Sequence, residues 1–502
     1  MHNYDVVIIG SGLGGLTCGA ILAKNGYRVC VLEKNQQIGG CLQTFSRDKT
    51  VFDSGVHYVG GLAPGQNLHQ IFKYLGIMDK LNLKRLDMDC FDRIAFAGDP
   101  REYKMAQSYD AFIQGLLADF PGEEKALKEY CAMLRHICDK FPLYNLRMGG
   151  FEEKESVLSI NAAEFINSLT SNRKLTQVLA ANNPLYAGVE DKTPMYVHAL
   201  VLNSYIESSW KCVNGGSQIG KWLSRAITEN GGTLLRYKEV QRIVAEGHDV
   251  QYVETAKGER FTAKHFISNM HPANTLNMLE SDVIRHAYRT RIKSLENSNS
   301  TLMVNVALQP GMFPHMNYNY YYHDVEDVWS GHEYTEDTWP RNYSMFISPD
   351  PRDHRYANGL SIMAYMNIRE VAPWADTFNT ASQEAPRGED YEAFKQRKAE
   401  KVLDMVEKRF PVLRQCIKNY YVATPLSFRD YIGTADGSMY GVMKDSRDPL
   451  RTFIAARTKL SNLYLTGQNL NMHGILGVTM SAVVTCAELL DMEKLLHEIK
   501  TA

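Results

Sequence analysis

The stretch YDVVIIGSGLGG, residues 4–15, decides the fold of this chain. Residues 6–9 are apolar without polar alternation, which is typical of a parallel strand covered on both faces. Gly10 permits a tight turn, Gly12 lets the backbone approach a pyrophosphate, and Gly15 lets the next helix pack closely on the sheet. The pattern therefore predicts a strand, a phosphate-binding turn and a helix in succession.

A helix, a second strand and a terminal acid follow in order. Residues 16–25 are small and apolar, which predicts a helix that ends at Gly26 and directs its N-terminal N–H groups at the phosphates. Residues 29–32 predict the second strand, and Glu33 at its end would accept hydrogen bonds from ribose hydroxyls. A lone GxGxxG is weak evidence, but this complete order indicates a dinucleotide-binding unit.

Composition restricts the class of protein. With 502 residues, 44% of them hydrophobic and 22% charged, the chain is long enough for two or more domains of a soluble globular protein. The net charge of −2 gives no reason to expect a nucleic-acid partner. The nine cysteines form no CxxC pair, so we expect no metal site, no disulfide framework and a reducing, cytoplasmic location.

Neither a signal peptide nor a membrane span is expected. The chain enters its first predicted strand within a few residues, which leaves no room for a signal peptide. Residues 460–487 carry no Asp, Glu, Lys or Arg, but polar side chains such as Asn462, Gln468 and His473 interrupt the run. A spanning helix would have to bury these polar groups, so we do not predict one.

The remaining chain alternates between helical and strand-rich regions. Apolar residues at helical spacing make residues 66–204 largely helical, as an insertion or cap. Residues 276–424 contain predicted strands, among them the tyrosine-rich stretch 318–322, whose side chains would line an apolar tunnel or form cross-strand aromatic pairs. Residues 462–468 predict a strand that ends in Gly467-Gln468, and a small-residue helix follows Gly474. This second strand–turn–helix unit would direct a helix N-terminus at a phosphate or at the edge of a flavin ring.

Several blocks together resemble the FAD-dependent phytoene desaturase, carotenoid isomerase and retinol saturase family of flavoproteins. The matching segments are residues 6–33, 39–40, 52–58, 214–216, 424–441 and 464–468 with Gly474. The segment 52–58 and the pair Tyr440-Gly441 are most similar to the retinol saturase branch. Regions 76–204 and 276–424 carry no matching motif.

The resemblance implies an α/β fold with a Rossmann-like FAD-binding domain of the GR2 type and a second, α+β substrate or cap domain. The FAD-binding domain would be discontinuous, with residues 1–75, 205–275 and 425–502, and the cap domain would comprise 76–204 and 276–424. The family binds FAD non-covalently. Carried over by position, the cofactor-binding residues would be Gly10, Gly12, Leu13, Gly14, Gly15, Glu33, Lys34, Gly39, Gly40, Gly55, Val56, His57, Val240, Gly467, Gln468, Gly474, Ile475 and Leu476. Many relatives carry an acid at the position of Gln468, and glutamine can still hydrogen-bond a ribityl hydroxyl.

The implied activity is an FAD-dependent oxidoreductase that saturates or desaturates C–C/C=C bonds of an apolar polyene or isoprenoid, with saturation favoured by the segment 52–58 and Tyr440. A proton donor must lie near the flavin, and His57, Tyr58, Tyr440 and His473 are the candidates. A redox-neutral cis–trans isomerase, a flavin amine oxidase and a flavin-binding carrier without chemistry remain alternatives.

The sequence gives limited information on the electron donor and on the cellular location. The sequence contains one GxGxxG and no paired redox cysteines, so disulfide chemistry is not indicated, while NAD(P)H as a transient electron donor stays open. A polyene substrate must be drawn from a bilayer or a carrier, which predicts peripheral contact with the inner face of a membrane. Nothing in the sequence indicates the oligomeric state.

Overall fold

The computed structural model describes residues 2–380 and 385–502 and contains two large sheets. The first sheet has the strand order β10-β2-β1-β13-β12-β11-β14, and β20 pairs with β13. Its strands are β1 (His2–Ile9), β2 (Val29–Leu32), β10 (Thr233–Leu235), β11 (Val240–Glu246), β12 (Asp249–Thr255), β13 (Arg260–Ser268), β14 (Leu279–Glu280) and β20 (Leu463–Leu465). β1 is parallel to β2 and β13, and β2 is parallel to β10. The predicted boundaries of β2 are therefore confirmed.

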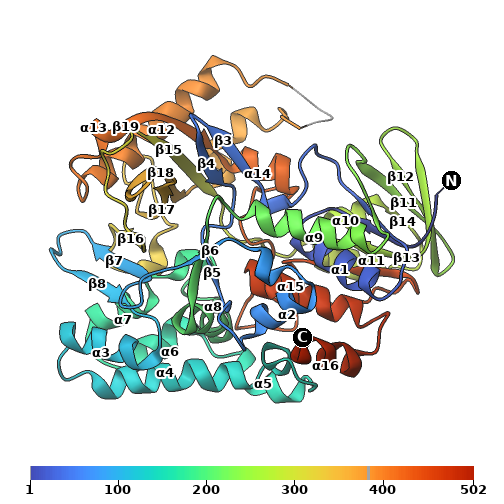
Figure 1. Cartoon of the computed structure of the whole chain (residues 1–502), viewed down its shortest axis with the longest axis horizontal. Coiled ribbons are helices and arrows are strands. Elements are labelled where there is room, and N and C mark those ends of the chain that lie inside the picture. The colour runs from blue at the N-terminus through green and yellow to red at the C-terminus, as the bar shows by residue number, and fades with distance from the viewer. Residues whose placement is uncertain (1, 381–384) are drawn as a thin grey trace.

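Helices and loops cover both faces of this sheet, as the unbroken apolar runs of β1 and β2 predict (Figure 1). One face packs against α1 (Leu13–Lys24), α9 (Ser217–Glu229) and α15 (Gly474–Cys486). The opposite face packs against α10 (Pro272–Met278), α11 (His286–Lys293) and the loop that precedes β20. α2 (Asn67–Tyr74) and α16 (Met492–Thr501) extend the first layer.

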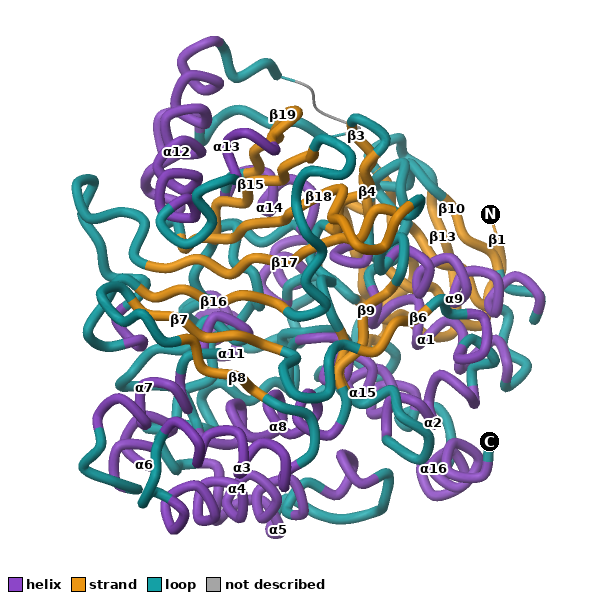
Figure 2. Tube along the Cα trace, turned by 60° about the vertical axis from the view of Figure 1, so that its left-hand side comes forward, coloured by secondary structure: helices purple, strands orange, loops and turns teal. Residues whose placement is uncertain are grey.

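The second sheet has the order β19-β15-β18-β17-β16-β7-β8, and Figure 2 shows these strands stacked from β19 to β8. They are β7 (Asp92–Phe96), β8 (Glu102–Met105), β15 (Thr301–Leu308), β16 (Asn319–His323), β17 (Asn342–Asp350), β18 (Asp353–Tyr365) and β19 (Ile417–Ala423). One face packs against α12 (Glu389–Glu407) and α13 (Leu413–Cys416). Because side chains alternate along a strand, the other face is free to form the wall of a site.

A layer of helices lies beside the β7–β8 edge of the second sheet (Figures 1 and 2). It consists of α3 (Tyr109–Asp119), α4 (Glu124–Asp139), α5 (Glu152–Leu158), α6 (Ala162–Ser168), α7 (Arg173–Ala180) and α8 (Met195–Glu207). The prediction of a largely helical region 66–204 is thus confirmed for most of its length. It missed β6 (Leu83–Arg85), which pairs with a strand far away in the sequence, and the local hairpin of β7 and β8, whose β7 edge joins the distant β16.

A hairpin, a small sheet and a helix join the two large parts. β3 (Thr44–Arg47) and β4 (Thr50–Asp53) form a hairpin, while β5 (Val59–Gly60) and β6 pair with β9 (Ser209–Cys212). α14 (Pro425–Ile432) begins with Thr424 and Ser427 in a capping box. The architecture is the predicted α/β fold, with a Rossmann-like sheet and a second α+β part.

Within the described residues, no helix combines the length and the apolar composition that crossing a bilayer requires. The uncharged stretch 460–487 contains β20 and the 13-residue helix α15.

Candidate active site

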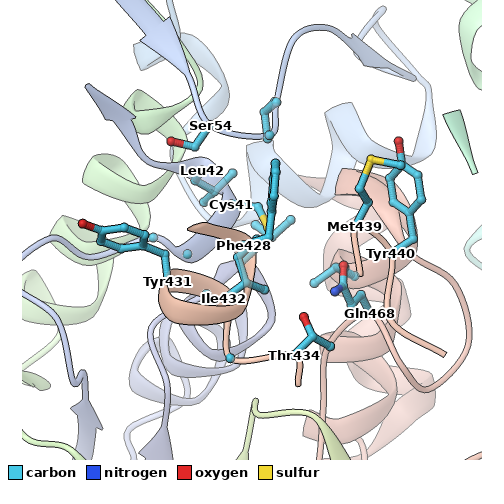
Figure 3. Close-up of a pocket in the computed structure, with 18 of the residues that line it drawn as sticks. Cys41, Leu42, Ser54, Phe428, Tyr431, Ile432, Thr434, Met439, Tyr440 and Gln468 are labelled. Atoms are coloured by element: carbon cyan, nitrogen blue, oxygen red, sulfur yellow. The ribbon is translucent and has the colours of Figure 1, made fainter. Parts of the chain in front are cut away.

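A large cavity lies between the two sheets and extends from the turn after β1 to the inner face of the second sheet. Its empty volume, including the part open to solvent, is about 2240 Å³. Figure 3 shows Phe428 and Ile432 of α14 close to Cys41 and Leu42, with Tyr440 and Gln468 on the other side. The cavity thus joins segments from the beginning, the middle and the end of the chain.

The glycines of the first turn leave space that an asparagine fills. Gly10 has a φ of +94°, a conformation that favours glycine. A Cβ on Gly12 would lie 2.8 Å from Nδ2 of Asn269, and a Cβ on Gly14 would lie 2.5 Å from its Oδ1. Asn269 directly follows β13, so it stands at the carboxyl edge of the parallel strands, where ligands of such sheets bind. No sequence motif assigned Asn269 to the site.

Glu33 lies buried at the end of β2, in the wall of the cavity. Its carboxylate accepts hydrogen bonds from the backbone N–H of Ser11 (3.1 Å), the hydroxyl of Ser11 (2.5 Å) and the backbone N–H of Asn35 (2.8 Å). These three donors hold the acid beside the glycine turn. The neighbouring Lys34 donates from Nζ to the carbonyl oxygen of Asp430 at 2.8 Å, which ties this edge to α14.

Most of the predicted cofactor-binding residues line this one cavity: Gly10, Gly12, Leu13, Gly14, Glu33, Lys34, Gly39, Gly40, Gly55, Val56, His57, Val240, Gln468, Gly474 and Ile475. Gly15 lies behind the wall, where a Cβ would come within 2.1 Å of the carbonyl oxygen of Gly10. Gly467 also lies outside the wall and packs against Asn269. Leu476 and the predicted donor His473 line a second cavity instead. The other predicted donors, His57, Tyr58 and Tyr440, line the first.

His57 is buried and stacks on Phe346 of β17, with ring centroids 4.2 Å apart. Burial and, to a smaller extent, the positive charge of Lys211 lower the pKa of His57 to about 3. Its Nε2 has no hydrogen-bond partner among the described residues. The imidazole is therefore neutral at physiological pH and presents an unpaired nitrogen in the cavity wall.

Tyr58 belongs to a buried hydrogen-bonded chain that the sequence did not reveal. Its hydroxyl lies 2.9 Å from Oδ2 of Asp92 and 2.9 Å from the hydroxyl of Tyr321, which also lines the cavity. Asn182 and Asn319 donate to the same carboxylate at 2.6 and 2.9 Å. Burial raises the pKa of Asp92 to about 7, although these three donors oppose the shift. Asp92 can therefore retain or release a proton near neutral pH.

Tyr440 and His473 lie together at the start of α15, with ring centroids 4.5 Å apart. The hydroxyl of Tyr440 donates to the carbonyl oxygen of Pro184 at 3.1 Å. Burial and the nearby charge of Lys444 lower the pKa of His473 to about 4. Both side chains are thus held as neutral groups beside the predicted position of a flavin ring.

The inner face of the second sheet supplies wall residues that carried no sequence motif, among them Thr301, Tyr321, Ser344, Phe346, Met363 and Tyr365. Tyr321 points into the cavity, whereas Tyr320 and Tyr322 stack on Tyr343 across the opposite face. Both interpretations of the tyrosine-rich stretch therefore hold, at alternate residues. Among the described residues, no cluster of His, Cys, Asp and Glu side chains is placed to hold a metal ion.

Comparison with known proteins connects these features. Residues 8–75 match the model of the NAD(P)-binding Rossmann-like domain. All-trans-retinol 13,14-reductase of Danio rerio is 27% identical over 97% of this chain and 86% of its own length. Prolycopene isomerase 2 of an Oncidium hybrid cultivar is 25% identical over 97% of this chain and 83% of its own length.

A solved structure supports the fold. Cyclohexylamine oxidase from Brevibacterium oxydans superimposes with a TM-score of 0.62 at 15% identity, covering 100% of this chain and 99% of that one. Similarity at this level of sequence identity establishes the fold alone. The reaction has to be inferred from the residues of the site. The sequence motifs, the Rossmann-like unit and these relatives, each matched over 97% of this chain, support the resemblance to the phytoene desaturase, carotenoid isomerase and retinol saturase family of flavoproteins.

Proposed function

We propose that the protein is an FAD-dependent oxidoreductase that saturates a C=C bond of an apolar polyene or isoprenoid substrate. The observation that carries this proposal is a single cavity with two chemically different ends. One end has the glycine turn and the buried acid of a dinucleotide site, and the other has an aromatic wall with a buried proton-carrying chain. The names of the full-length relatives support a substrate of the retinoid or carotenoid class.

The residues present suit FAD. Gly12 and Gly14 line the cavity at the N-terminus of α1, where backbone N–H groups would stabilise a pyrophosphate. Glu33 and Val240 would contact the adenosine end, Gln468 the ribityl chain, and Gly474 with Ile475 the ring, with Lys34, Gly39, Gly40, Gly55 and Val56 completing the wall. The unpaired Nε2 of buried His57 is available to a ligand. Residues 1–75, 205–275 and 425–502 would form the FAD-binding domain, and NAD(P)H would serve as a transient electron donor.

When bound and reduced, FAD supplies a hydride to one carbon of the double bond. The protein must then deliver a proton to the other carbon. We assign this step to Tyr321, whose side chain lines the cavity, with Tyr58 and Asp92 resupplying the proton. When Asp92 is protonated, it can donate to Tyr58 and Tyr58 to Tyr321, which leaves the hydrogen of Tyr321 free for the substrate.

Tyr58 is thus a relay, which gives one of the four predicted donors a specific role. His57 and His473 are less suited to store a proton, because burial lowers the pKa of both imidazoles to about 3 and about 4. Tyr440 is held by the carbonyl oxygen of Pro184. We assign these three side chains to positioning the ring and the substrate.

Redox-neutral cis–trans isomerisation is the second candidate, because prolycopene isomerases match the chain over almost its whole length. The amine oxidase alternative has only likeness of fold in its favour.

An anaerobic spectrum distinguishes these functions. The purified protein is reduced with dithionite, a panel of polyenes and retinoids is added, and flavin reoxidation is followed together with product mass. Reoxidation with a gain of two mass units is the expected result. Isomers of unchanged mass over a flavin that stays reduced would establish the isomerase. A protein that contains no flavin and takes none up would overturn the proposal.

A further inference from the structure

A second cavity adjoins the first and is lined mainly by apolar side chains. It shares Tyr58, Leu185, Tyr205, Gly474 and Ile475 with the cofactor cavity. From these shared residues it extends between α8, the segment 141–158 and the start of α15. Its polar groups include Lys444, whose Nζ is already bonded to the carbonyl oxygens of Thr452, Asn469 and Leu470. The remaining wall therefore offers an apolar ligand many contacts.

The outer part of this second cavity is formed by large apolar side chains that are exposed to solvent. Phe151 is 39% exposed, Leu450 is 64% exposed and Phe453 is 42% exposed, and all three line the cavity. Met148, which is 53% exposed, is adjacent to the lining residue Gly149. These four residues, here called the apolar rim, come from two segments about 300 residues apart. Contiguous exposed apolar groups of this kind mark an interaction site.

The charges beside the apolar rim are of both signs. α5 carries Glu152, Lys154 and Glu155 after Phe151, Glu153 of the same helix pairs with Arg147, and Arg451 is exposed between Leu450 and Phe453. Arg291 of α11 donates to the carbonyl oxygens of Arg451 and Phe453 at 2.7 and 3.1 Å, which fixes the loop that carries two rim residues. Mixed charges match zwitterionic headgroups better than a uniformly anionic surface, because positive and negative side chains stand together beside the rim.

We propose that the apolar rim docks the protein on the surface of a zwitterionic lipid bilayer, so that Met148, Phe151, Leu450 and Phe453 enter the acyl region and the second cavity opens toward it. A lipid bilayer is the partner that fits this arrangement, because the exposed apolar rim leads into an apolar cavity, and that cavity adjoins the cofactor cavity. A substrate that partitions into acyl chains then reaches the site without crossing water. This last consequence rests on the proposed function, whereas the docking itself does not.

The test measures vesicle binding without any substrate. The full-length protein is sedimented with phosphatidylcholine vesicles, alone and with added phosphatidylserine. The double variant L450D/F453D should bind at least about tenfold more weakly, because burying an apolar side chain of this size contributes about a factor of ten in partition. The matched control M312D/V412D also alters two exposed apolar residues, 44% and 50% exposed, that line neither cavity, and it should bind like the wild type.

A depth measurement gives a second, independent readout. The variants Leu450→Trp and Met312→Trp are mixed with vesicles whose acyl chains are brominated, and quenching beyond that of the wild-type protein is expected only for Leu450→Trp. Equal vesicle binding by L450D/F453D and the wild type would overturn the proposal. So would a wild type that ignores vesicles but forms dimers that L450D/F453D disrupts, since the rim would then join two copies. Vesicle binding by a protein that reduces no polyene would leave the docking intact and refute the proposed function.

Discussion

The two ends of the main cavity are built in different ways. At the dinucleotide end the wall is mostly backbone and small residues from short contiguous segments, such as residues 10–14 and 39–40. At the substrate end it consists of large side chains that project singly from β15, β16, β17 and β18, such as Tyr321 and Phe346. In the proposed function, the first end would bind a cofactor that many proteins share, and the second would fit one substrate class. Glycines therefore determine the backbone shape at the first end. At the second end, a few polar atoms within an apolar wall determine which reaction the site can support.

The largest effect should come from a change behind the dinucleotide end. Gly15→Ala places a Cβ 2.1 Å from the carbonyl oxygen of Gly10, so α1 must move away from β1. We expect a loss of at least about 3 kcal/mol in the free energy of unfolding, and loss of bound flavin. Thermal unfolding and the flavin absorbance of the purified protein measure both.

Gly115→Ala is the control, because Gly115 lies in α3 with open space around its Cβ position. This change should leave flavin binding unaltered and stabilise the helix by up to about 1 kcal/mol. A Gly15→Ala protein with wild-type stability and flavin content would show that close packing of α1 on β1 is not what positions the turn.

The next effect tests the substrate end. Tyr321→Phe removes the hydroxyl that we assign to proton delivery, and the rate of polyene reduction should fall about a hundredfold. Tyr343→Phe removes a buried hydroxyl that has no partner among the described residues and lies on the opposite face of the same sheet. Its turnover should stay unchanged. Single-turnover reoxidation of the reduced flavin compares the two, and similar rates for both variants would contradict the assignment.

Asp92→Asn should remove a pH dependence. Because burial raises the pKa of Asp92 to about 7, the wild type should lose about tenfold in the rate of polyene reduction between pH 6 and pH 8, and the variant should be slower with no such dependence. A carboxyl whose pKa is raised on folding stabilises the protein most at low pH, and that stability is lost as the pH rises toward 7. The wild type should therefore lose about 1 kcal/mol of unfolding free energy between pH 6 and pH 8 that the variant retains.

Urea unfolding and single-turnover rates at the two pH values measure these effects. The variant can keep its hydrogen bonds, since Asn182 has an unpartnered Oδ1 that can accept from the new amide after a flip. Identical pH profiles for both proteins would show that Asp92 supports structure alone.

The contrast between the two ends also explains what the sequence could predict. Residues 29–32 were placed correctly as a strand, because the unbroken apolar run there reflects burial on both sides. β7 escaped prediction because Asp92, a polar residue, opens it, and β17 because it begins with Asn342 and includes Ser344. Asp92 and Tyr321 are 229 positions apart, so only tertiary structure brings them into one chain of hydrogen bonds. Local motifs reveal a shared cofactor site, while a substrate wall that depends on strand pairing stays hidden.

The smallest effect is expected from Glu33, a side chain that would contact the cofactor at the dinucleotide end, where the rest of the wall is mostly backbone. Glu33→Gln keeps the size of the side chain but turns an amide N–H₂ toward Ser11 or Asn35, which both donate to the native carboxylate. We expect FAD affinity to fall three- to tenfold, about 1 kcal/mol, with turnover at saturating FAD unchanged. Glu246→Gln, at an exposed end of β11, is the surface control. Release of flavin fluorescence on dilution gives both affinities. If Glu33→Gln lowers stability while FAD affinity stays at the wild-type value, Glu33 only secures the turn, and the dinucleotide end is built from backbone alone.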